Sequence, residues 1–159
     1  MIMIIKYLKI FIATSLLHIS VYSHCQIPCG IYSDAAQIMQ IKEDLSTIEK
    51  AMNEIKYLST KSDPLSLNQI NRWVAAKEKH AQNIQEISSK YFLTQRIKEN
   101  SENYVEKLKV SHQLLISVMK CKQSVDVKNV TNSKIFLESF VELYFDKHGI
   151  DHLKSLSIK

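Results

Sequence analysis

Hydrophobic residues recur at helical spacing along most of the chain, in four runs that are separated by polar or turn-forming segments. The first run extends from Ser33 to about Ser59, and its apolar residues follow one another in steps of three or four, as on one face of an α-helix. These residues are Ile38, Ile41, Leu45, Ile48, Met52, Ile55 and Leu58. We expect Ser33 to cap the start of this helix and the segment 62–64, which contains a proline, to end it.

A second helical run is predicted to start at a capping box formed by Ser66 and Gln69. It extends towards Lys98, and its apolar stripe consists of Ile70, Val74, Ala81, Ile84, Ile87 and Tyr91. A third run starts at the polar cluster 100–103 and carries Val105, Leu108, Leu115, Val118 and Met119 on one face. We expect Cys121, which lies in this third run, to be a buried and inert thiol.

The last part of the chain predicts one more helix. Residues 124–132 are polar with scattered valines, and we interpret them as a connection. The fourth run carries Ile135, Phe136, Phe140, Leu143 and Tyr144. It ends at His148 and Gly149, because glycine suits the left-handed position after a helix, and we expect the tail 150–159 to fray. Four amphipathic helices with short connections predict an all-α fold in which residues 33–149 form an antiparallel four-helix bundle.

The composition agrees with one helical domain. Hydrophobic residues occupy 45% of the 159 positions and charged residues 23%, which is typical of a folded globular chain. Two glycines and two prolines are too few for an all-β sandwich with its frequent turns. The net charge is +5, but residues 1–23 contribute two lysines and no acidic residue, so the remainder carries +3. Because the basic and acidic residues are interspersed, we expect no nucleic-acid partner.

Residues 1–23 have the pattern of a secretory signal peptide. Lys6 and Lys9 precede an uncharged, largely apolar stretch that ends at Ser23, which predicts cleavage before His24. The alternative is a retained membrane anchor. A spanning helix needs about 20 apolar residues, and the uncharged stretch is shorter and contains His18. We therefore expect residues 24–159 to be exported to the periplasm or the extracellular medium, an oxidising compartment, without stable membrane association.

The segment that would become the new N-terminus concentrates unusual chemistry. Residues 24–32 hold two of the three cysteines, one of the two prolines and one of the two glycines. After cleavage, the α-amine of His24, the backbone nitrogen and thiolate of Cys25, and the thiolate of Cys29 can surround a metal ion. Adjacent chelate rings favour a planar arrangement, and planar nitrogen and sulfur donors indicate Ni(II) or Cu(II) rather than tetrahedral zinc. A Cys25–Cys29 disulfide of an exported protein is the alternative.

The motif His-Cys-x-x-Pro-Cys-Gly-x-Tyr at residues 24–32 resembles the N-terminus of the nickel-containing superoxide dismutases. A weaker resemblance continues through residues 67–74, 77–81 and 91–96. It implies an enzyme that disproportionates superoxide to dioxygen and hydrogen peroxide, with one nickel ion per subunit cycling between Ni(II) and Ni(III). It also implies a metal-binding hook at residues 24–32 ahead of the helical bundle, and assembly as a homohexamer.

The resemblance also implies a role for each residue of the motif. His24 would supply its amine and an axial imidazole, Cys25 its amide nitrogen and thiolate, and Cys29 its thiolate. Pro28 would hold the turn of the hook. Tyr32 would order water or a small anion at the open face of the metal, although it can also serve only to pack the hook on the bundle.

Two positions depart from the pattern of some members of that family. Gln26 stands where an acidic residue can occur, and His80 lies near the point where some members carry an arginine that holds the axial imidazole. We therefore expect His80 to support the metal site indirectly. The alternative for the whole chain is an exported, non-catalytic helical bundle that has a Cys25–Cys29 disulfide or carries a metal.

Overall fold

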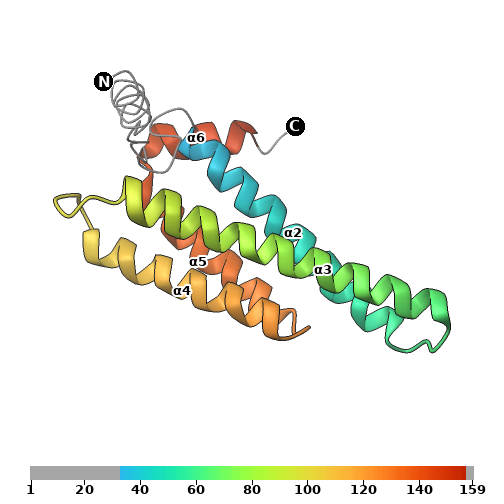
Figure 1. Cartoon of the computed structure of the whole chain (residues 1–159). Coiled ribbons are helices and arrows are strands. Elements are labelled where there is room, and N and C mark those ends of the chain that lie inside the picture. The colour runs from blue at the N-terminus through green and yellow to red at the C-terminus, as the bar shows by residue number, and fades with distance from the viewer. Residues whose placement is uncertain (1–32, 157–159) are drawn as a thin grey trace, which may run out of the picture.

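The computed structural model describes residues 33–156, and over this range the chain is helical with short connections (Figure 1). This confirms the predicted all-α class. Along the chain the elements are α2 (Asp34–Leu58), α3 (Pro64–Glu86), the π-helix η1 (Ile87–Arg96), α4 (Tyr104–Gln123), α5 (Lys128–Tyr144) and α6 (Lys147–Leu156). Residues 1–32 and 157–159 lie outside the described part, and with them the predicted signal peptide and hook.

The four long helices pack as two pairs. Helix α2 lies along α3 and α4 lies along α5, and the pairs meet through contacts of α3 with α4 and of α2 with α5. The pair α2–α3 extends well past the end of α4–α5, and α6 crosses near the start of α2 (Figure 1). The shared core therefore lies at the end of the molecule where α2 begins.

Helix α2 follows the predicted apolar stripe closely. Its predicted residues from Ile38 to Ile55 are buried, and only Leu58 at the end of the stripe is partly exposed. Burying an isoleucine or leucine side chain completely contributes about 1.5–3 kcal/mol, so this stripe is a principal source of stability. Ser33 precedes the helix as expected, but its side chain makes no capping hydrogen bond.

The start of α3 corrects the predicted capping box. The carboxylate of Asp63 accepts hydrogen bonds from the backbone N–H of Ser66 at 3.0 Å and from its hydroxyl at 2.6 Å. These bonds hold the pKa of Asp63 below its ordinary value. Pro64 occupies the first turn, where a missing N–H costs nothing. The helix therefore starts earlier than predicted, with Asp63 rather than Ser66 as its cap.

Three apolar residues of the predicted stripes are exposed. Val74 continues the buried face of α3, but it lies about one turn before the α3 residue that donates to the last carbonyls of α4, so it is past the end of that helix, and its exposed fraction is 38%. Val105 and Ile135 are 67% and 56% exposed. Each precedes a buried residue by two positions, which turns it about 200° away on the helix. Those buried neighbours are Lys107 and Leu137.

The boundaries of the last helices also differ from the prediction. Helix α5 begins at Lys128, within the predicted connection, and ends at Tyr144 rather than at Gly149. The predicted frayed tail instead forms α6, whose first turn is fixed by a 2.7 Å hydrogen bond from the backbone N–H of Gly149 to the Asp146 carboxylate. Leu153 is buried in the core. Burial of the apolar face of α6 stabilises this helix more than the tendency of a short terminal helix to fray destabilises it.

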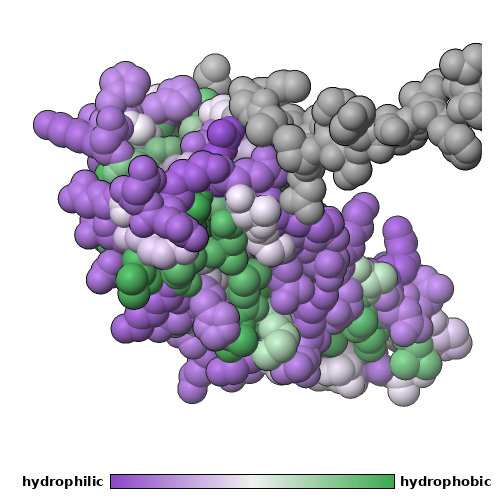
Figure 2. Space-filling model, turned by 60° about the vertical axis from the view of Figure 1, so that its left-hand side comes forward, coloured by the Kyte–Doolittle hydropathy of each residue, from purple (hydrophilic) through white to green (hydrophobic). Residues whose placement is uncertain are grey.

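The surface agrees with the modest charge of the chain. Most of the face seen in Figure 2 is hydrophilic, and hydrophobic residues reach it in narrow strips. Within residues 33–156, none of the helices combines the length and the apolar character needed to cross a membrane.

Candidate metal centre

The predicted metal ligands belong to the part of the chain that precedes the described residues. His24, Cys25 and Cys29 lie there, together with Pro28 and Tyr32. Between residues 33 and 156, no three His, Cys, Asp or Glu side chains are grouped so that they could hold a metal ion. The structure therefore describes the scaffold that follows the predicted hook.

Four side chains meet at the start of this scaffold, and we call them the Asp34 cluster: Asp34, Tyr91, Arg96 and Tyr144. Asp34 is the first residue of α2. Its Oδ1 accepts a hydrogen bond from the Tyr91 hydroxyl at 2.5 Å and pairs with Nε of Arg96 at 3.0 Å. Its Oδ2 accepts the Tyr144 hydroxyl at 2.7 Å. Arg96 also donates from Nη2 to the Tyr91 hydroxyl at 2.7 Å. The cluster joins α2, η1 and α5 in one network.

The protonation states in the Asp34 cluster follow from its environment. Burial, reinforced by the Asp34 carboxylate, raises the pKa of Tyr144 far above its ordinary value. The same two causes raise the pKa of Tyr91. The hydrogen bond to Tyr91 raises the pKa of Arg96 further. At neutral pH both tyrosines are therefore donors to Asp34, and Arg96 is a cation beside it.

The π-helix explains why Tyr91 and Arg96 face the same carboxylate. The two residues are five positions apart, and in an α-helix they would point about 140° away from each other. A π-helix repeats its hydrogen bonds from i to i+5, so that five residues complete roughly one turn. Side chains follow the same five-residue pattern, since Thr94 donates to the carbonyl of Ser89 and Gln95 to that of Lys90.

His80 lies against a buried carboxylate between α2 and α3. Asp44 is only 1% exposed. Its Oδ1 lies 2.6 Å from Nδ1 of His80, and its Oδ2 accepts a hydrogen bond from the Asn83 amide at 2.6 Å. Gln40 adds a longer bond of 3.3 Å to Oδ1. A carboxylate only accepts hydrogen bonds, so Nδ1 donates and Nε2 remains available. The predicted supporting residue is thus held in a fixed orientation.

The length of the intervening chain allows His80 to act on the predicted ligands. Asp44 lies ten residues along α2 from Asp34, which corresponds to about 15 Å. Asp34 follows His24 by ten positions, and ten residues can span at most about 35 Å. His24 can therefore reach the neighbourhood of His80.

Comparison with known proteins identifies the chain. The family model of nickel-containing superoxide dismutase matches residues 19–148, which include the whole N-terminal motif and the helices from α2 to α5. The chain belongs to this family. It is accordingly an enzyme, an oxidoreductase that acts as a superoxide dismutase, and its cofactor is nickel. No curated protein and no solved structure matches the chain.

Most of α6 lies beyond the residues that the nickel superoxide dismutase model matches. The Asp34 cluster lies wholly inside them. The sequence pattern places Tyr91 only in a core stripe, and it does not reveal Asp34, Arg96 and Tyr144 as members of a polar network. The five-residue spacing of Tyr91 and Arg96 gave no signal, because it fits no α-helical face.

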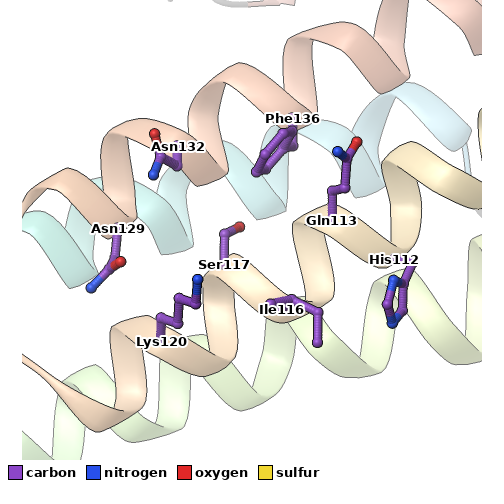
Figure 3. A pocket seen from close by; sticks show the side chains of 8 residues that line it. All are labelled: His112, Gln113, Ile116, Ser117, Lys120, Asn129, Asn132 and Phe136. Atoms are coloured by element: carbon purple, nitrogen blue, oxygen red, sulfur yellow. The ribbon is translucent and has the colours of Figure 1, made fainter.

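A cavity of about 340 Å³ opens between α4 and α5 of this superoxide dismutase. Figure 3 shows residues of α4, such as Ser117 and Lys120, along one wall and Asn129 and Asn132 of α5 along the other. None of its lining residues belongs to the Asp34 cluster or contacts His80 in the described hydrogen bonds. The cavity is therefore a feature separate from the scaffold of the predicted hook.

Proposed function

We propose that this enzyme dismutates superoxide at a nickel ion held by its processed N-terminus, with one ion per subunit. The ligands are the amine and imidazole of His24, the amide nitrogen and thiolate of Cys25, and the thiolate of Cys29. The observation that carries this proposal is the donor set of residues 24–32, all of which fall within the family match. This set of nitrogen and thiolate donors would suit nickel.

Bound nickel supplies one-electron chemistry between Ni(II) and Ni(III), so that two superoxide ions and two protons give dioxygen and hydrogen peroxide. The residues of the chain hold and orient the reactants. Pro28 keeps the hook turned, and the Tyr32 hydroxyl donates a hydrogen bond to the incoming anion or to a water molecule. His80, whose ring is oriented by Asp44, would accept a hydrogen bond on Nε2 from the N–H of the His24 imidazole and hold that ring in place.

Processing and export form part of the same proposal. Cleavage before His24 frees the amine ligand, so export through the signal peptide activates the chain in the periplasm or outside the cell. The subunits form four-helix bundles and assemble as a homohexamer. The packing of α2 on α3 and of α4 on α5 fits a bundle.

The decisive experiment adds one alanine between the cleavage site and His24 in an exporting host supplied with nickel. The extension turns the amine ligand into an amide, so we expect nickel-dependent superoxide removal to fall at least 100-fold. A chain with one alanine after Lys159 is the matched control and should keep full activity. Native mass spectrometry gives the mature N-terminus and the nickel content of each sample.

Two outcomes would contradict the proposal. Full activity of the alanine-extended chain would show that the amine is not a ligand. A wild-type chain that starts at His24, binds no nickel and is lighter by two hydrogens would instead favour the non-catalytic bundle with a Cys25–Cys29 disulfide.

A further inference from the structure

We infer that Asp34 is a positioning residue for the metal hook, because the Asp34 cluster fixes the point where the hook joins α2. This inference rests on the proposed function of residues 24–32. It assigns to Asp34, Arg96 and Tyr144 a role that acts through Tyr32 and the ligands before it.

The first step is covalent. Asp34 follows Tyr32 by two residues, and two residues span at most about 7 Å. The position of the Asp34 backbone therefore limits where Tyr32 can lie, and its orientation sets the direction in which the chain leaves α2. A displacement of this first helical residue would be transmitted directly to the hook.

The second step concerns what holds Asp34. Both carboxylate oxygens are used, Oδ1 by Tyr91 and Arg96 and Oδ2 by Tyr144. Tyr91 lies 57 residues away in the sequence and Tyr144 lies 110 residues away. These partners belong to two other elements, η1 and α5. The carboxylate is therefore held from two sides, and it cannot rotate without breaking at least one of these bonds.

The third step separates this role from ordinary packing. Ala35, Ile38 and the later residues of the stripe already bury α2 in the core, whereas Asp34 is the first residue of the helix, where helix ends commonly fray. Its side chain is not the N-cap of the helix, since Ser33 occupies that position. A charged network at this end adds little apolar burial but fixes one geometry, as hydrogen bonds between ionised groups and fixed partners do.

The test compares two isosteric substitutions. Asp34→Asn removes the negative charge of the carboxylate and leaves the positive charge of Arg96 in the cluster. Glu49→Gln is the matched control, because Glu49 also ties α2 to α5, through a 2.7 Å ion pair with Lys134. It lies 15 residues further along α2, about 22 Å away. Both variants are examined with and without nickel.

Three readouts distinguish positioning from simple stability. Amide hydrogen exchange of the nickel-free chain should rise at least tenfold over residues 37–41 in Asp34→Asn, the first amides of α2 that are protected by hydrogen bonds inside the helix, with the exchange in α4 unchanged. Nickel release to a chelator should be at least tenfold faster, and the electron paramagnetic resonance spectrum of oxidised nickel should change. Glu49→Gln should stay within twofold of the wild type in exchange and release, with an unchanged spectrum.

The inference is overturned if Asp34→Asn matches Glu49→Gln in all three readouts, or if its exchange rises uniformly over all helices. Should Asp34→Asn fail to fold, Tyr144→Phe removes only the hydroxyl that holds Oδ2 and is scored by the same criteria. The exchange of the nickel-free chain does not depend on the identity of the metal ligands. It therefore tests Asp34 even if the alanine extension shows that the amine is no ligand.

Discussion

Lys77 should be one of the most sensitive positions outside the metal site. It lies on α3 with a side chain that is 4% exposed, yet it carries a charged ammonium group. Nζ donates to the backbone carbonyls of Cys121 at 2.7 Å and Lys122 at 2.5 Å, and pairs with Glu78 at 2.9 Å. It thereby supplies partners for carbonyls in the last turn of α4, which a helix cannot satisfy internally.

The substitution Lys77→Met keeps the length of the side chain and removes the charge. A hydrogen bond from a charged group contributes about 1.5–3 kcal/mol, and a buried carbonyl left without a partner costs about 1–3 kcal/mol. Relief from burying the ammonium group offsets part of this loss. Because the backbone carbonyls cannot be removed together with the lysine, we expect a net loss of about 3 kcal/mol in the free energy of unfolding.

Urea unfolding of the nickel-free protein, followed by circular dichroism, measures this loss. With a slope of about 1–3 kcal/mol per molar urea, the midpoint should fall by about 1–3 M. Lys79→Met is the matched control, because Lys79 lies on the same helix and is exposed, and its effect should stay within about 0.5 kcal/mol. An unchanged midpoint for Lys77→Met would mean that the three bonds only compensate for desolvation, and would refute this reasoning.

Two further predictions follow from the titrating groups. Since burial raises the pKa of Tyr144 and of Tyr91 in the folded state, the unfolded chain loses these protons first, above about pH 10. The contribution of these two tyrosines to stability should therefore be fully present below pH 10 and fall as the pH rises beyond it. The urea midpoint should fall less steeply with pH in Tyr144→Phe than in the wild type, and equal slopes would contradict the raised pKa. Cys121 is fully buried and burial raises the pKa of its thiol. In a Cys25→Ser, Cys29→Ser double variant it should react with a thiol reagent at least 100-fold more slowly in the native state than in urea, and rapid native labelling would contradict its burial.

The sequence allowed the positions of the helices to be predicted better than which side of each helix is buried. The stripe of α2 was predicted correctly because one face of this helix meets the core along nearly its whole length. Val74 has the same periodicity but is exposed, since the pattern does not say where the neighbouring helix ends. The cap of α3 was misplaced because Ser66 and Asp63 both fit common capping patterns, and only the fold shows which side chain accepts the bond.

The candidate site likewise contains residues that could be predicted from the sequence and residues that could not. The ligand residues could be proposed from chemistry that is local in sequence, because cleavage would place an amine, an amide and two thiols within six positions. The Asp34 cluster could not be predicted, since its members come from three distant parts of the chain. His80 was assigned a supporting role from the resemblance, whereas its partner Asp44 was unexpected as a buried carboxylate within an apolar stripe.

The π-helix gives this enzyme some tolerance to changes in chain length. An α-helix brings residues four positions apart to one face, whereas η1 does so for Tyr91 and Arg96 at five. If one residue between these two were deleted, the segment could wind as an ordinary α-helix and the tyrosine and arginine would still face the same side. Such a deletion would therefore shift the numbering after this helix by one and leave the pairing of the tyrosine and the arginine in place.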